Sequence, residues 1–156
     1  MNYHVKSLIS FSTLNIDFKK IINLKKTNMS FLAKLELDDK TYNVLECKYS
    51  FSQQIDNTGK PQGMPQGGEI SIRIESTGSP ELLGWMLDHN KTKDGKIIFY
   101  RRDAMSKLQV LNFKKAYCIN FVEYFNSSNN DPLQIEFQLI AKTFDVNGAT
   151  HEKKWR

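Results

Sequence analysis

The sequence is poor in the residues that build most catalytic and metal sites. Its 156 residues include three histidines, at positions 4, 89 and 151, and none has a metal-ligand spacing such as HExxH. The two cysteines, Cys47 and Cys118, form no CxxC pair, and no GxSxG motif is present. We therefore expect no catalytic residues, no metal and no cofactor, and we predict that the protein is not an enzyme.

Long hydrophobic runs and phosphate-binding loops are also missing. No stretch approaches the roughly 18 to 20 consecutive apolar residues that a membrane-spanning helix needs, so we expect no membrane insertion. Gly59-Lys60 is followed by Pro61 rather than by Ser or Thr, which excludes a P-loop there. The sequence motifs therefore give no positive indication of an enzyme.

The net charge of +5 does not indicate a nucleic-acid partner, because of where the charge lies. Residues 1–28 carry five lysines against Asp17 alone, a net of +4, which leaves +1 for residues 29–156. Phe99-Tyr100-Arg101-Arg102 is the one weak candidate for an RNA-binding surface, because two aromatic residues adjoin two arginines. The apolar run that it continues favours a core strand instead. We expect no nucleic acid to bind.

Residues 1–28 differ from the rest of the chain. The apolar stretch after Lys6 is short, and no small-residue cleavage site follows it, which disfavours a signal peptide. Residues 17–26 could form a short amphipathic helix. We expect residues 1–28 to be a disordered leader or to lie upstream of a true start at Met29. Residues 29–156 are predicted to form a single domain.

From residue 29 the sequence alternates between apolar and polar residues, which predicts strands with one buried face. Residues 31–37 and 41–51 form a predicted hairpin around the turn Asp38-Asp39-Lys40. Residues 69–75, with three isoleucines on one face, and residues 133–141 alternate most regularly. We expect Cys47 to be buried on the face that also carries Leu45, Tyr49 and Phe51.

One short helix is predicted at about residues 80–89, with Ser79 as its cap, Pro80 in its first turn and Trp85 on its apolar side. Lys93-Asp94-Gly95-Lys96 is typical of a turn and leads into a strand, 97–102, that is apolar on both faces. The predicted fold is mainly β, either a small β-barrel or two packed sheets, with one flanking helix.

A long projecting loop at about residues 53–68 is the most unusual stretch. Loops between strands are usually about 2 to 5 residues long, and longer ones tend to be functional or disordered. Its prolines lack backbone donors, so we expect it to stay outside the sheet and project. The residues that we assign to a subunit or ring-stacking interface are Asn57, Thr58, Gly59, Lys60, Pro61, Gly63, Pro65, Gly67 and Gly68.

A loop of this kind, together with long strands that leave sheet edges to be covered, indicates self-association. Four segments of the sequence also resemble the type VI secretion tube protein family, Hcp (TssD), of the Bacteroidetes kind. The resemblance covers residues 29–156, and the segments that carry it are residues 29–35, 52–61, 82–87 and 94–103. An alternative from the same kind of architecture is a phage-type tail tube protein, and a second is a monomeric β-barrel that binds a ligand.

The resemblance implies a structural subunit that forms hexameric rings, and these rings stack into a hollow tube. A contractile sheath would surround the tube, a spike protein would cap it, and effector proteins would travel in its lumen. The family has no catalytic residues to transfer to this chain. The resemblance also implies a protein that is cytoplasmic when assembled and is then secreted by the machine itself, without a signal peptide.

Overall fold

The computed structural model describes residues 31–102, 106–128 and 131–155, so the leader and the possible helix at 17–26 lie outside the described residues. Within the described part, the chain forms seven strands and one helix. Their bounds are β1 Ala33–Leu37, β2 Lys40–Ile55, β3 Pro61–Glu75, α2 Glu81–Leu87, β4 Lys93–Tyr100, β5 Lys107–Tyr124, β6 Gln134–Val146 and β7 Ala149–Glu152.

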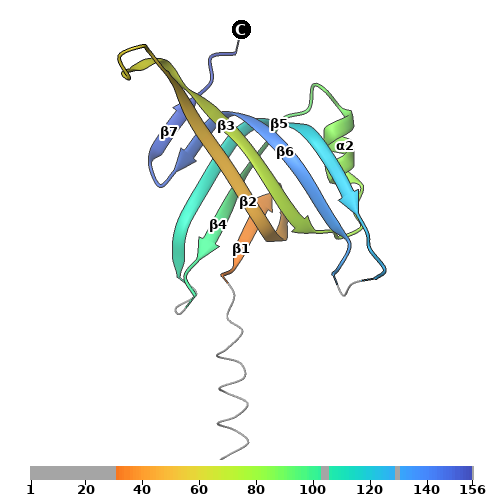
Figure 1. Cartoon of the computed structure of the whole chain (residues 1–156). Helices are drawn as coiled ribbons and strands as arrows, with labels where there is room; N and C mark the ends of the chain where they lie inside the picture. The colour runs from red at the N-terminus through yellow and green to blue at the C-terminus, as the bar shows by residue number, and fades with distance from the viewer. Residues whose placement is uncertain (1–30, 103–105, 129–130, 156) are drawn as a thin grey trace, which may run out of the picture. The chain divides into compact units, whose positions relative to one another are not determined.

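The strands belong to a single antiparallel sheet that closes on itself. Their order is β3-β2-β1-β4-β5-β6-β7, and an additional pairing of β3 with β6 joins the first six strands into a ring (Figure 1). Strand β7 pairs with β6 outside this ring. The prediction of a mainly β fold with one short helix is confirmed, and the described strands form one closed sheet rather than two packed sheets.

The core fills the inside of this ring, because each strand turns its apolar face inward. Ile70, Ile72 and Ile74 of β3 are all 0% exposed. Ile72 lies opposite Phe137 of β6, which is also fully buried. Each buried isoleucine contributes on the order of 1.5–3 kcal/mol. A shift by one residue would turn all three outward, so this register is strongly determined.

The predicted turn at residues 93–96 is wrong, because these residues form the first half of β4. Gly95 is required there by packing. A Cβ atom on it would lie 2.5 Å from Cζ of Phe113 and 2.9 Å from the carbonyl oxygen of Glu36. The prediction that the following residues are apolar on both faces is confirmed, since Ile97 and Ile98 are both buried.

Helix α2 is shorter than predicted and begins differently. Pro80 occupies its N-cap position without a side-chain hydrogen bond, so Ser79 is not the cap. Trp85 is 1% exposed, packs against Phe137 and donates from Nε1 to the carbonyl oxygen of Lys91 at 3.0 Å. Leu87, in contrast, is 76% exposed, because the short helix buries only one side.

A bulge in β2 corrects another prediction. Leu45 has no partner between the pairs Val44–Ile74 and Glu46–Arg73, so the strand gains one residue there. The extra residue exchanges the two faces of the strand. Leu45 is therefore exposed, whereas Cys47 lies on the core face and is half-buried.

Candidate assembly interface

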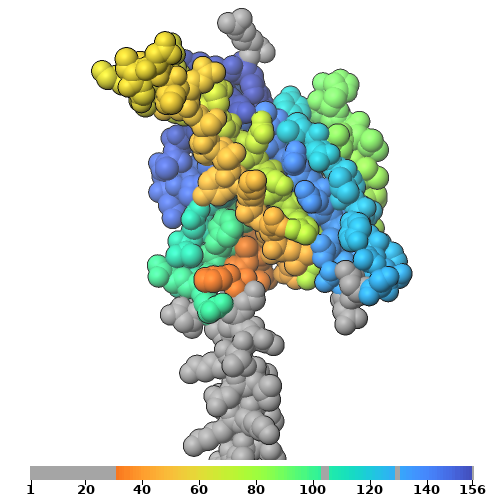
Figure 2. All heavy atoms as spheres, in the orientation of Figure 1, coloured from red at the N-terminus to blue at the C-terminus, as the bar shows by residue number. Residues whose placement is uncertain are grey.

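Strands β2 and β3 continue well beyond the ring of strands as a two-stranded ribbon. The pairing of β3 with β6 ends at Glu69–Ile140, whereas its pairing with β2 continues to Ile55–Pro61. We call residues 51–67 the arm; Figures 1 and 2 show it extending away from the body of the sheet. The prediction that this stretch cannot join a sheet is wrong, although the stretch does project.

The prolines fit into the arm because each strand of a two-stranded ribbon has a neighbour on one side only, so some of its backbone N–H groups are not needed for pairing. Pro61 pairs with Ile55 at the end of the ribbon, next to the turn. Pro65 lies where the register shifts, between the pairs Ser52–Gln66 and Gln54–Gln62. Proline is tolerated at strand ends, at edges and at bulges, since no ladder donor is lost there.

The tip of the arm is a tight turn that Asp56 holds together. Its Oδ1 accepts hydrogen bonds from the backbone N–H of Thr58 at 2.8 Å, from the Thr58 hydroxyl at 2.7 Å and from the N–H of Lys60 at 3.0 Å. These bonds, that of the Thr58 hydroxyl above all, lower the pKa of the Asp56 carboxyl. Gly59 adopts φ = +83°, which favours glycine in this turn.

The structure divides the predicted interface residues into two groups. Residues 57–61, Gly63 and Pro65 lie in the exposed outer part of the arm. Gly67 and Gly68 lie at its base, where they are half-buried and buried. A Cβ atom on Gly67 would lie 2.2 Å from the ring of Phe51, so this glycine allows the ring to pack across the arm.

The outer arm has no hydrophobic core of its own. Ile55 is 69% exposed and Met64 is 77% exposed, and the remaining side chains of the outer arm are polar or small. Only the base is anchored, because the ring of Phe51 packs edge-on against Phe144 at 5.0 Å and against His151 at 5.1 Å. Isolated two-stranded hairpins are at best marginally stable in water, so this arm is suited to binding a partner.

Two long strand edges complete the candidate interface; the sequence predicted that sheet edges would need to be covered but not which strands carry them. Strand β1 pairs with β2 only as far as Val44, and no described strand pairs with that edge of β2 beyond it. Strand β4 pairs with β5 only as far as Ala116, and no described strand pairs with the corresponding edge of residues 117–124. Such edges present unpaired N–H and C=O groups to another chain.

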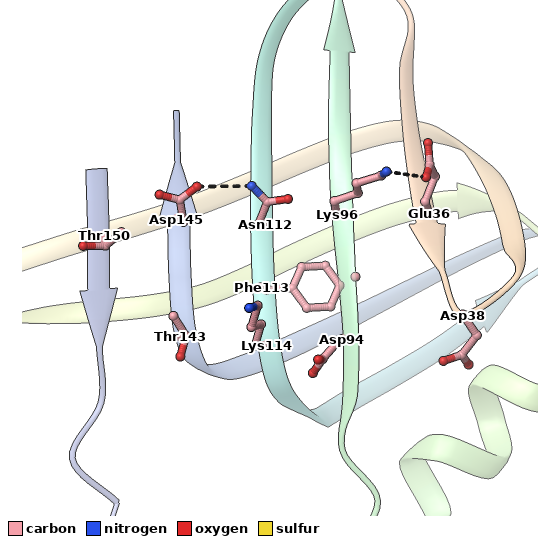
Figure 3. A pocket seen from close by; sticks show the side chains of 11 residues that line it. Glu36, Asp38, Asp94, Lys96, Asn112, Phe113, Lys114, Thr143, Asp145 and Thr150 are labelled. Atoms are coloured by element: carbon pink, nitrogen blue, oxygen red, sulfur yellow. Dashed lines mark hydrogen bonds and ion pairs between the residues drawn. The ribbon is translucent and has the colours of Figure 1, made fainter. Parts of the chain in front are cut away.

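A hollow on the outer face has a different character, because most of the residues that line it have polar side chains. Glu36, Lys96, Asn112, Asp145 and Thr150 form one row across five neighbouring strands (Figure 3). Lys96 pairs with Glu36 at 2.8 Å, and Asn112 donates to Asp145 at 3.1 Å. These groups mainly satisfy one another around a space of about 750 Å³.

Neither a metal site nor an activated thiol emerges from the described residues. They contain no group of three or more His, Cys, Asp or Glu side chains that could hold a metal ion. Cys47 and Cys118 are free thiols, and burial raises the pKa of each to about 11. A nucleophilic cysteine needs the opposite shift. No helix among the described residues has the length and apolar character that a membrane crossing requires.

Comparison with known proteins identifies the family. Residues 29–156 match the family model described as "Hemolysin coregulated protein Hcp (TssD)". The structure of Hcp1 from Flavobacterium johnsoniae is similar at 35% sequence identity and a TM-score of 0.75, and the match covers 79% of this chain and 100% of that one. No curated protein matches the sequence.

More distant structures share the fold. Hcp1 from the E. coli EAEC 042 pathovar is 12% identical with a TM-score of 0.62, and the match covers 81% of this chain and 100% of that chain. Hcp1 from Salmonella typhimurium is 11% identical with a TM-score of 0.61, and the match covers 78% and 91% of the two chains. With the family match over residues 29–156, the chain belongs to the Hcp (TssD) family of type VI secretion tube proteins, which is a structural family and not an enzyme family.

Proposed function

We propose that this chain forms hexameric rings that stack into the hollow tube of a type VI secretion system. The observation that carries the proposal is the pair of unpaired strand edges, on β2 and on β5, together with an arm that has no core of its own. Two different edges suit a head-to-tail contact, in which one edge of each subunit binds the other edge of the next. Such a contact produces a ring when the rotation from one subunit to the next leads back to the first.

The topology allows the two edges to meet without any change of fold. Strands β2, β3, β6 and β5 are neighbours in that order, and each is antiparallel to the next. Because the directions alternate, β5 of one copy would lie antiparallel to β2 of the next copy. Repeated around a ring, the four strands would form one continuous wall with no exposed edge.

The face of these four strands that points away from the core would line the lumen. Two rows of partners cross it, Glu46–Arg73–Glu136–Val122 and Lys48–Ser71–Gln138–Asn120, and every member except Val122 is polar. Arg73 makes an ion pair with Glu46. A hydrated wall of this kind would let folded effector proteins pass without adhering, which agrees with the proposed role as an effector carrier.

The strand edges of β2 and β5 would supply the contact between subunits within a ring, so the arm would make the contact between successive rings. Residues 57–61, Gly63 and Pro65 form its outer part, and Gly67 and Gly68 set its base. The sheath and the spike protein are the further partners that a tube of this family requires. With export by the machine itself, the subunit would be assembled in the cytoplasm and then released outside the cell.

Solution mass and negative-stain electron microscopy of the full chain test ring formation. We expect closed particles with a central hole, because each edge pairs only once, and a mass of about six subunits, as the resemblance to the Hcp family implies. The subunit mass is 18.1 kDa. A monodisperse monomer at millimolar concentration would contradict the proposal and would favour a monomeric ligand-binding module.

Deleting residues 57–66 tests the role of the arm separately. The deletion leaves Ser52–Asp56 to connect Phe51 with Gly67, and five residues are a common length for a hairpin loop. We expect rings that no longer stack into tubes. Met64→Asp should weaken stacking as well. Gln62→Asp introduces the same charge on the same strand without removing an apolar side chain, and it serves as the control. Normal stacking of the deletion variant would show that the arm is not the stacking contact.

A further inference from the structure

An apolar cavity of about 300 Å³ lies beside the unpaired edge of β2. It opens where β1 begins, since the pairing of β1 with β2 starts at Ala33–Val44. From Glu46 onward no described strand occupies the place beside β2. The cavity is lined by Cys47 and Tyr49 of β2, by Phe99 of β4 and by Leu108 and Gln109 of β5, among others.

Two polar side chains of the lining pair with each other, and most of the lining surface is apolar. Gln109 donates from Nε2 to the hydroxyl of Tyr49 at 3.0 Å, which bridges β5 and β2 across the cavity. Leu108 is 47% exposed at the rim, and Cys47 is half-buried. The site therefore offers apolar contact directly next to unpaired backbone groups.

We propose that a second copy of this chain seals the cavity with the unpaired edge of its β5, and that Ile119 is the side chain that anchors it. The inference rests on the proposed ring. Ile119 is an extra residue between the pairs Cys118–Leu139 and Asn120–Gln138, and it is 44% exposed on that edge. One side of the contact thus has the unpaired edge of β2, the cavity and the exposed Leu108. The other side has the unpaired edge of β5 and the exposed Ile119 at its bulge.

Substitutions at the rim and at the anchor should weaken the ring without affecting the fold. Leu108→Glu and Ile119→Glu each place a carboxylate in an apolar contact without a partner, so the ring dissociation constant should rise about tenfold or more. Leu87→Glu is the matched control, because Leu87 is more exposed but lies on α2. Circular dichroism and the melting temperature show whether each variant folds.

Thiol labelling measures the accessibility of the cavity without any substitution among the residues that line it. In a full-length Cys118→Ser variant, the rate at which a maleimide modifies Cys47 is measured across the concentration range in which the solution mass changes from monomer to ring. We expect the rate to fall at least about tenfold on ring formation, in step with the mass, because the neighbour covers the cavity.

Each other result has a distinct meaning. Rings that form while Cys47 reacts as fast as in the monomer would overturn the sealing of this cavity and leave the tube function standing. A mass that never exceeds one subunit would contradict the proposed function itself.

Discussion

The two halves of β3 show how differently one strand can be stabilised. Between Ile70 and Ile74 the strand has neighbours on both sides, and its three isoleucines are fully buried. Between Pro61 and Gln66 it has one neighbour and no buried side chain. The inner half is stabilised by the core of its own chain, whereas the outer half is ordered by a tight turn and an aromatic anchor and leaves its apolar groups for another molecule.

The largest expected effect is on the part of the molecule that is stabilised by the core of its own chain. Trp85→Ala should lower the free energy of unfolding by about 3–5 kcal/mol, as for other buried aromatic residues. Trp85 is 1% exposed, and its indole N–H is hydrogen-bonded. Chemical denaturation measures the change, with Leu87→Ala, on the exposed side of the same helix, as the control. An unchanged free energy would mean that Trp85 is not part of the core.

A smaller effect tests packing within the ring of strands. Gly95→Ala should destabilise the fold by about 1–3 kcal/mol, because the added Cβ overlaps with Phe113 and with the backbone of Glu36. Gly84→Ala is the matched control. Apart from its chain neighbours and the backbone of its own helix, no atom lies within 4 Å of the added Cβ, and alanine favours the helix, so a gain of up to about 1 kcal/mol is expected. Equal effects of the two variants would contradict the packing described for Gly95.

The smallest effects concern the arm. Asp56→Ala removes the acceptor for Thr58 and Lys60, so the amides of the tip should exchange faster while the melting temperature stays nearly constant.

The pKa of Asp56 is lowered in the folded chain. The stabilisation of the turn is therefore complete above the ordinary aspartate pKa and is lost as the pH falls through the lower, folded value. Amide chemical shifts of Thr58 during an acid titration measure this, and an unshifted midpoint would contradict it.

The thiols provide a further small test of burial. Because burial raises the pKa of Cys47 and Cys118 to about 11, both should react slowly at neutral pH and faster as the pH rises toward 11. The pH dependence of maleimide modification, followed for each cysteine by peptide mass mapping, measures this. A rate that levels off near pH 8 would show ordinary, exposed thiols.

The alternation of apolar residues predicted the inner half of β3 and most of the fold, because one buried face leaves a period of two in the sequence. It failed where the backbone departs from regular pairing. The bulge at Leu45 exchanges the faces of β2, and Gly95 looks like a turn residue although packing against Phe113 requires it within a strand.

The candidate interface was only partly predictable for related reasons. The glycines and prolines of the arm indicated a projecting segment, but they concealed its pairing, since a two-stranded ribbon tolerates proline at its end and at its bulge. The unpaired edges of β2 and β5 depend on where the short strands β1 and β4 stop pairing. That information lies in long-range register and not in any local pattern.

Hydrogen exchange of the full chain, as single rings and as stacked tubes, tests most directly whether the arm depends on a partner. We expect the amides of residues 70–74 to be protected in both states, whereas the amides of residues 52–66 should exchange rapidly in single rings and become protected in tubes. Strong protection of the arm in single rings would contradict this dependence, because the arm would then be stable without the neighbouring ring.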